Sequence, residues 1–383
     1  MTPWLFPLHR LGLTAALALT LTAALAAAPA AEPLRIALTG QALIKHDLRA
    51  VHPEKSRAVA AALAGHDVVF TDLEVAIDTG RGQKTRESQF FHATRPDVLD
   101  CLKDWHFNLL ALSNNHAWDL GAEGILGTIQ AVEARGFVHA GNGASLAAAA
   151  APAYLATPRG RVALVSMASG RGNGKDASAT ATRAGINEVQ LDEKTGEIDA
   201  AHAARVFDAL RTAAAQADVV IVYQHDHFWE KDNRVTPEWK KRFARACIDA
   251  GATIFVSHGA PLLHGIELYR GGVIFYDLGG LVFHTITAPG YYLPEVWESA
   301  IAYTEFTGGR LSALRLRPVA LNERGEGEPP SPQFYRTRGM PAPASGAQAR
   351  SILARLAKLS VPYGTKITIS GESAVVEIPS APR

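Results

Sequence analysis

Short apolar runs alternate with amphipathic stretches between residues 34 and 283. The apolar runs predict β-strands, which we place at 34–40, 67–75, 107–113, 161–169, 217–225, 252–258 and 271–283. The stretches between them have helical periodicity and predict helices at 53–65, 95–106, 121–136 and 236–252. In the last of these helices we expect Thr236 as the N-cap and Pro237 as the first helical residue. This alternation favours an α/β fold whose strands are buried on both faces.

The residues after 283 predict a smaller unit of a different kind. A strand pair turns around Gly308-Gly309, and the proline-rich segment 325–333 is typical of a linker or surface loop. A helix at 347–359 and a hairpin at 365–378 follow. We therefore expect a main domain at 33–286. At 287–383 we expect a small C-terminal α+β extension, in which the strand pair, linker, helix and hairpin pack on the core.

The first thirty residues have the pattern of a secretory signal peptide. Arg10 supplies a basic start, residues 11–28 are uncharged and apolar, and Ala28-Pro29-Ala30 is a small-residue cleavage pattern. An uncleaved membrane anchor is the alternative, because the apolar run approaches the length that spans a bilayer. We favour a cleaved signal peptide at residues 1–30. The mature protein is then exported to the periplasm, the cell envelope or the medium, without a stable transmembrane span.

The charge balance argues against a nucleic-acid-binding protein, and the cysteine content excludes a four-cysteine zinc site. The chain has 38 Lys and Arg against 37 Asp and Glu, and loss of Arg10 with the signal peptide would make them equal. Without a net positive charge or a basic run, the chain lacks the electrostatic pattern of a nucleic-acid-binding protein. Its two cysteines, Cys101 and Cys247, are too few for a four-cysteine zinc site. They could form a disulfide, but both lie in helical patterns, which favours two buried thiols.

Polar side chains gather where four of the predicted strands end. Since ligands of α/β sheets bind at the carboxyl ends of strands, these residues are expected to share one rim. A mixture of carboxylates, amides and imidazoles suits Mn²⁺, Fe²⁺ or Zn²⁺. Each residue taken alone also fits a helix cap, a turn or an ordinary buried hydrogen bond. The residues concerned are Asp72, Glu74, Asn114, Asn115, His116, Asp119, His225, Asp226, His227, His258 and His264.

An ordered set of motifs resembles a known family. "DLE" at 72–74, "NNHAWDLG" at 114–121, the histidine after "VVIVYQ" and "HGAPLLHGIELYRGGVIFYDLGGLVF" at 258–283 occur in the order found in the CapA capsule-biosynthesis family. That family acts in poly-γ-glutamate synthesis and belongs to the calcineurin-like metallophosphatase superfamily. The resemblance implies a four-layer α/β/β/α sandwich of metallophosphatase type, a metal site at the strand ends and a place in the bacterial cell envelope.

The resemblance also implies roles for individual residues. Glu74 stands where a metal-bridging carboxylate is expected, and Asn115, His225 and His258 match further metal ligands. His116 matches the histidine that protonates a leaving group. Asp119 would orient that histidine. The implied cofactor is one or two divalent transition-metal ions.

The sequence departs from the family pattern at two places. Gln41 follows Gly40 where the family has an aspartate, so an acidic ligand is replaced by a neutral amide. The family's Gly-His-His-Pro-His motif is replaced by "SHGAP" at 257–261, which removes at least one imidazole. Both losses fall mainly on one of the two metal positions. The residues that could substitute are His46, Asp47, Asp72 and His227.

The sequence does not decide between two functions. One is an exported metal-dependent hydrolase that acts on a phosphoester or an envelope polymer. The other is a non-catalytic protein that binds an anionic polymer, such as polyglutamate, during its assembly or export, within an envelope biosynthesis complex. Retention of His116 and Asp119 favours chemistry, whereas Gln41 and the segment 259–261 favour binding.

Overall fold

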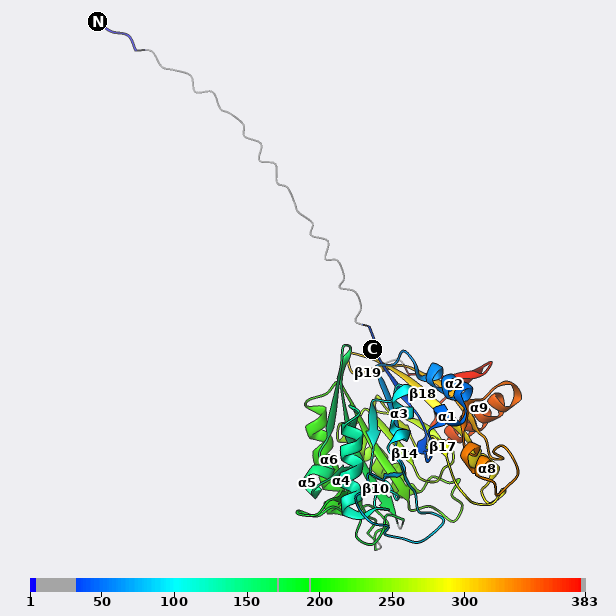
Figure 1. Ribbon diagram of the computed structural model, residues 1–383. Helices are drawn as coiled ribbons and strands as arrows, with labels where there is room; N and C mark the ends of the chain where they lie inside the picture. Colours follow the sequence, from blue (N-terminus) through cyan, green and yellow to red (C-terminus); the bar gives the residue numbers. More distant parts are fainter. Residues whose placement is uncertain (5–31, 171, 193, 380–383) are drawn as a thin grey trace. The chain divides into compact units, whose positions relative to one another are not determined.

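Two β-sheets organise the chain, which is a mixed α/β protein (Figure 1). The computed structural model describes residues 1–4, 32–170, 172–192 and 194–379. The predicted signal peptide therefore lies outside the described residues, apart from its first four. Within the described residues, no helix combines the length and the apolar character that crossing a bilayer requires.

The larger sheet has nine strands in the described part of the chain and is mixed in direction. Strands β1, β3, β6 and β7 run parallel to one another, whereas β18 pairs antiparallel with β1. The predicted C-terminal strand pair, β18 and β19, thus forms part of this sheet. In spatial order the strands are β21 (Ile367–Ser370), β22 (Ser373–Val376), β19 (Arg310–Leu321), β18 (Glu298–Thr307), β1 (Leu34–Leu38), β3 (Val68–Asp72), β6 (Leu109–Ala111) and β7 (Val138–Ala140), with β20 (Pro341–Pro343) on β19.

The second sheet has seven strands in the described residues, and its central strands are parallel. In spatial order they are β12 (Glu188–Val189), β10 (Gly160–Gly170), β13 (Val219–His227), β14 (Ile254–His258), β16 (Gly272–Phe275) and β15 (Ile266–Tyr269), with β9 (Ala153–Thr157) on β10. Three two-stranded sheets complete the β-structure of the described residues: β2 (Gln41–Leu43) with β17 (Gly280–Phe283), β4 (Ala76–Ile77) with β5 (Ala93–Thr94), and β8 (Asn142–Gly143) with β11 (Gly185–Ile186).

Alternate residues of the central strands belong to different hydrophobic clusters, as the twofold period of a strand requires. Ile36 and Phe70 of the larger sheet share one cluster with Ile221 and Val256 of the second sheet. Their neighbours in sequence face away from this cluster and pack with helical residues. Strands with both faces buried explain the nearly continuous apolar runs in the sequence.

Helices pack on the outward-facing residues of both sheets. One cluster joins residues of β1, β3 and β6 to helices α1 to α4, and another joins β10, β13 and β14 to α6 and α7. In Figure 1, α5 and α6 lie on the left of the view, and α1, α2 and α9 on the right. The helices are α1 (Leu48–Val51), α2 (Pro53–Leu63), α3 (Asp97–Asp104), α4 (Gly121–Glu133), α5 (Leu146–Ala150), α6 (Ala200–Ala214), α7 (Glu238–Asp249), α8 (Pro332–Thr337) and α9 (Gly346–Ser360), with 3₁₀ turns η1 (Pro294–Trp297) and η2 (Val361–Tyr363).

The predicted strand 271–283 is wrong as a single element. It is divided into β16, in the second sheet, and β17, which pairs with β2. The turn between them is closed by Asp277, whose Oδ1 accepts a hydrogen bond from the Gly279 backbone N–H at 2.8 Å. Gly279 has a φ of +73°, a conformation in which a β-carbon would be strained. The run is apolar on both sides of this turn because both pieces are buried, so hydrophobicity alone does not reveal where the strand breaks.

The predicted start of α7 is wrong by one residue. The N-cap is Pro237, which makes no side-chain capping bond, and the helix begins at Glu238. The hydroxyl of Thr236 instead lies 3.2 Å from His264 Nδ1. The cysteines agree with the favoured prediction, because Cys101 and Cys247 are buried free thiols in different hydrophobic clusters.

Candidate metal centre

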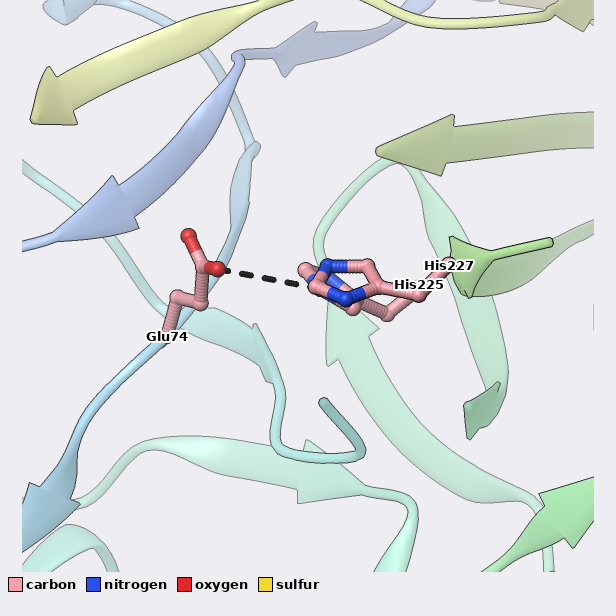
Figure 2. A group of neighbouring side chains, drawn as sticks. All are labelled: Glu74, His225 and His227. Carbon is pink, nitrogen blue, oxygen red and sulfur yellow. Dashed lines mark hydrogen bonds and ion pairs between the residues drawn. The ribbon is translucent and has the colours of Figure 1, made fainter. Parts of the chain in front are cut away.

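Parallel strands from both sheets deliver polar side chains to one buried place. Glu74 lies two residues beyond the end of β3, and His225 and His227 lie at the end of β13. One ligand atom from each of these three residues lies within 4.8 Å of the others (Figure 2). The carboxylate of Glu74 faces the two imidazoles, and its Oε1 is 3.7 Å from His225 Nε2. The spacing of these donors could hold a metal ion.

Asp72 and Tyr223 fix the far side of the His225 ring. His225 Nδ1 lies 3.3 Å from Asp72 Oδ2 and 3.2 Å from the Tyr223 hydroxyl. Asp72 is itself held by Asn114, whose Nδ2 donates to Asp72 Oδ1 at 3.0 Å. A ring nitrogen that contacts a carboxylate leaves the other nitrogen, Nε2, to face the cluster, which is the usual arrangement around a metal-binding histidine. Asp72 therefore touches His225 in this structure and is placed behind it.

A second chain of contacts runs from Asp119 through His116 to Asn115. His116 Nδ1 lies 3.0 Å from Asp119 Oδ2, and His116 Nε2 lies 2.9 Å from Asn115 Nδ2. The remaining oxygen of Asp119 contacts Arg86 Nε at 2.8 Å. The backbone N–H of His92 also donates to Asp119 Oδ2, at 2.7 Å. Asp119 is thus oriented by two groups besides the imidazole that it holds.

The remaining predicted ligands, His258 and Gln41, lie in the same region but outside the three-residue cluster. His258 ends β14 directly beside His225 in the parallel register, and its ring is 5.4 Å from that of Tyr223. Gln41 begins β2 and lines the same cleft as Glu74 and His116. Both side chains are buried, at 0% and 1% exposure. His227, named from the sequence only as a substitute, joins Glu74 in the cluster, whereas His258 does not.

A cleft of about 510 Å³ adjoins the cluster of Glu74, His225 and His227. Glu74, Asn115, His116 and His227 contribute to its wall, together with the segment Gly259 to Pro261 that departs from the family motif. Four partly exposed side chains with large apolar surfaces surround it: Phe90, Trp229, Tyr291 and Leu293. A ligand in the cleft can therefore reach both the acid–imidazole cluster and the His116 chain.

Burial shifts every titratable group of the cluster toward its neutral form. Burial raises the pKa of Asp72 to about 8, and burial with the neighbouring Asp72 charge raises the pKa of Glu74 well above its usual range. Burial lowers the pKa of His225 and of His227 to about 3. Glu74 Oε2 and Asn115 Oδ1 have no hydrogen-bond partner among the described residues. Unpartnered oxygens and neutral imidazoles are the donor set that a divalent cation requires, so these residues fit one.

Four residues close to the site could not be recognised, or were not identified, from the sequence. Arg86 lies in a polar loop, and His92 lies directly before the two-residue strand β5. Neither position has a sequence pattern typical of a strand or a helix. The His92 ring packs edge-on against His116 at 4.3 Å, and burial lowers its pKa to about 2. Lys240 lies on a helix where a solvated charge is normal. Asp277 follows the apolar run 271–276, and the rule of polar groups at strand ends would have identified it.

Lys240 forms a buried ion pair directly behind the histidines of β13. Its Nζ lies 2.8 Å from Asp226 Oδ2, and both side chains are almost fully buried, at 1% and 0% exposure. Asp226 Oδ1 accepts hydrogen bonds from the Ser169 hydroxyl and the Phe228 backbone N–H, at 2.8 and 3.0 Å. Asp226 lies between His225 and His227, so this pair holds the segment that presents both imidazoles.

Lys240→Met is expected to lower the free energy of unfolding by about 3–5 kcal/mol. The substitution keeps an unbranched side chain one heavy atom shorter, but leaves the Asp226 carboxylate buried without a counter-charge. Lys241→Met on the same helix is the matched control, since Lys241 pairs with the exposed Glu238 and should change stability by less than about 1 kcal/mol. Urea denaturation of both variants tests the difference. Equal stabilities would show that the pair does not stabilise β13.

Comparison with known proteins identifies relatives of this chain. The family described as "Bacterial capsule synthesis protein PGA_cap" matches residues 35–285. An uncharacterized protein of Sinorhizobium fredii, y4sH, is 26% identical over 88% of this chain and 92% of its own length. The PGA biosynthesis protein CapA of Bacillus subtilis is 28% identical over 57% of this chain and 53% of its own. The capsule biosynthesis protein CapA of Bacillus anthracis is 28% identical over 59% of this chain and 53% of its own.

These matches confirm the family predicted from the sequence motifs. The matched region contains Glu74, the His116 chain and both histidines of β13, so the site lies wholly within it. The matched regions of the two Bacillus proteins cover only about half of those proteins, so the likeness concerns this part of them. From the family match, the chain belongs to the bacterial capsule synthesis protein (PGA_cap, CapA-like) family.

Proposed function

We propose that this protein is an exported, metal-dependent hydrolase of metallophosphatase type that cleaves a phosphoester or polymer bond during capsule or envelope synthesis. The observation that carries the proposal is the buried group of Glu74, His225 and His227, which opens into the same cleft as His116. A ligand cluster without a proton donor would suit simple metal storage. A cluster beside an imidazole held by a buried carboxylate suits bond cleavage.

The fold supports this proposal. The two sheets share one hydrophobic cluster, and each has a helix-covered cluster on its other face, which supports a four-layer α/β/β/α sandwich as part of the proposal. The site lies where parallel strands of the facing sheets end, as expected for a ligand site of an α/β fold. We take this arrangement to be the metallophosphatase sandwich.

Glu74, His225 and His227 would hold the ion, with Asn115 and His258 as further donors beside them. A bound divalent ion supplies a Lewis acid for a phosphoryl oxygen and lowers the pKa of a water molecule. His116 lines the cleft and has Nδ1 directed at Asp119 and Nε2 directed at Asn115 Nδ2. Once protonated at Nε2, it can donate that proton to the departing oxygen, while the Asp119 carboxylate stabilises the positive ring.

The relatives suggest the setting in which the chain acts. Two are named for capsule or PGA biosynthesis, and a third, from Mycobacterium tuberculosis, is named as a probable polyglutamine synthesis accessory protein. We extend this to a role in synthesis of an anionic polymer at the cell envelope, with the signal-peptide pattern of residues 1–30 as the route of export. An envelope biosynthesis complex is the expected environment.

A second function, binding of an anionic polymer without turnover, is favoured by one specific observation. Gln41 and the Gly259–Pro261 segment line the cleft where the family motif supplies an acidic residue and a second imidazole. The amide oxygen of Gln41 is buried without a hydrogen-bond partner in the described chain, so it remains free to bind. Loss of an acidic ligand and of an imidazole at one metal position would weaken water activation there.

Metal analysis and a phosphodiesterase assay together separate the two functions. Protein purified without chelator should contain about one equivalent of a transition metal, because three protein ligands with an open position form a catalytic type of site. Hydrolysis of bis(p-nitrophenyl) phosphate should require that metal and should stop after treatment with EDTA. A metal-free protein that Mn²⁺, Fe²⁺ and Zn²⁺ neither stabilise nor activate would overturn the hydrolase proposal and leave the binding function.

A further inference from the structure

A second, smaller cavity of about 250 Å³ lies beside the candidate metal centre. The two cavities share one residue, Thr285, so they adjoin each other. The polar side chains that line the smaller cavity are basic or neutral, and its lining contains no Asp or Glu among the described residues. These polar side chains are Lys45, His46, His284, Thr285, Tyr335 and Arg336.

His284, which lines this cavity, has a buried hydrogen-bond donor without a partner among the described residues. The backbone N–H of Lys45 donates to His284 Nδ1 at 2.8 Å, so Nδ1 is an acceptor and carries no proton. The neutral ring must then carry its proton on Nε2. That Nε2 is buried without a hydrogen-bond partner in the described chain, and the side chain is 2% exposed. A buried N–H without an acceptor is costly, and an oxygen ligand would satisfy it.

Two cationic side chains line the same cavity as His284. Lys45 and Arg336 both line the cavity, and neither forms an ion pair with any described residue. Burial lowers the pKa of Lys45, and the charge of Asp119 acts in the opposite direction. The oxygens of Asp119, however, already contact Arg86 and His116. The charges of Lys45 and Arg336 therefore remain available to an anion from solvent.

We propose that this cavity is a subsite for an oxyanion group of the ligand that occupies the adjoining metal cleft. His284 Nε2 would donate one hydrogen bond, and Lys45 and Arg336 would supply the positive charge. The inference rests on the proposed function, because it gives that function a polyanionic substrate with one anionic group at the metal centre and a second in this cavity. A carboxylate of a glutamate polymer and a phosphate group offer the same oxyanion chemistry.

Binding to metal-free protein tests the subsite apart from the metal centre. In EDTA and low salt, the affinities of tri-γ-glutamate and of inorganic phosphate are measured by calorimetry for wild type, Arg336→Gln and His284→Phe. We expect each variant to weaken binding about tenfold, the effect of losing one charge-assisted or buried hydrogen bond. Arg57→Gln is the control, because Arg57 is an exposed arginine on α2 away from the cavity. Thermal unfolding checks that His284→Phe is folded, and Arg336, being exposed, should tolerate replacement.

Each outcome bears on the proposal. Weaker binding of tri-γ-glutamate alone assigns the subsite to a carboxylate polymer, and weaker binding of phosphate alone assigns it to a phosphate group. Affinities that match wild type in both variants, or that fall equally in Arg57→Gln, overturn the subsite. Metal content of Arg336→Gln is measured in parallel. Loss of oxyanion binding with normal metal content supports the subsite whatever the fate of the hydrolase proposal. A wild-type protein that takes up no metal, but whose oxyanion binding is weakened by the two variants, contradicts only the hydrolase proposal.

Discussion

Glu74→Gln is expected to abolish the stabilisation that Mn²⁺ gives to the wild-type protein. Glu74 is the only carboxylate in the cluster found among the described residues, and the substitution keeps its shape while removing its charge. Metal affinity should fall by more than the roughly 10–100-fold that loss of an outer ligand-supporting group causes. Wild type at a metal concentration 100 times its dissociation constant gains about 2.7 kcal/mol, and the variant should gain little of it. Thermal or urea unfolding with and without Mn²⁺ measures both values.

The same substitution should have the opposite effect on the metal-free protein. Burial raises the pKa of Glu74 and of Asp72 in the folded state, so folding without metal must either bind protons or bury like charges. A folded-state pKa above the unfolded value means that the folded chain binds more protons, and stability then falls as pH rises. Glu74→Gln removes one of these carboxyl groups. It should therefore stabilise the metal-free chain at neutral and alkaline pH.

The pH range of this effect is set by the neighbouring groups. The imidazoles of His225 and His227, with pKa values lowered to about 3, make stability rise with pH up to about 6.5, where unfolded histidine titrates. Above that value only carboxyl groups with raised pKa values remain, including Asp72 at about 8. Between about pH 6.5 and 8 the wild-type metal-free protein should lose stability, and Glu74→Gln should lose less.

A surface glutamate provides the control for both experiments. Glu123 on α4 pairs with Arg81, and its side chain is 58% exposed, so Glu123→Gln should change neither the Mn²⁺ effect nor the pH dependence appreciably. If Glu74→Gln and Glu123→Gln respond alike to Mn²⁺, the cluster of Glu74, His225 and His227 does not bind metal.

The strand ends could be predicted because two local patterns coincide there. A buried parallel strand gives a continuous apolar run, and its carboxyl end shows as an abrupt change to polar residues. This change marks Asp72, Asn114 and His225, and the structure brings all three within one hydrogen-bonded group. The sequence could therefore indicate the region of the site and most of the residues in it.

The sequence could not show which of the neighbouring histidines belong to the cluster with Glu74. His225 and His227 point to the same side because a strand has a period of two, which makes them equivalent in a pattern. Only the approach of Glu74 from the other sheet places His227 in the cluster and leaves His258 beside it. That approach depends on how the two sheets pack, and no short stretch of sequence encodes it.

Residues that act on the site from loops and helices were also beyond prediction. Arg86 reaches Asp119 from a loop earlier in the chain, and Lys240 reaches Asp226 from a helix on the outer face of the second sheet. A charged residue in a polar loop or on an amphipathic helix normally faces water. Long-range contacts alone distinguish these two from the exposed charges around them.

Asp119→Asn is expected to lower turnover by about 10²–10⁴-fold while leaving metal content unchanged. The Asp119 carboxylate fixes the proton of neutral His116 on Nδ1, 3.0 Å away, and would stabilise the ring when it is protonated to serve as an acid. An asparagine can direct its N–H at Nδ1, which moves the ring proton to Nε2, opposite the Asn115 Nδ2 donor at 2.9 Å. The ring would then face a donor on each side, and protonation would lack a nearby negative charge.

Two measurements distinguish this role from a structural one. The rate of bis(p-nitrophenyl) phosphate hydrolysis at saturating substrate and metal should fall in Asp119→Asn and stay near wild type in Asp104→Asn, a half-exposed partner of Arg49. Nitrogen NMR of His116 should show the proton on Nδ1 in wild type and on Nε2 in the variant. Because Asp119 also binds Arg86 and the His92 backbone, a folding defect would reduce thermal stability and metal content together. A variant with full metal content, the unchanged wild-type tautomer and wild-type turnover would exclude His116 and Asp119 from proton transfer.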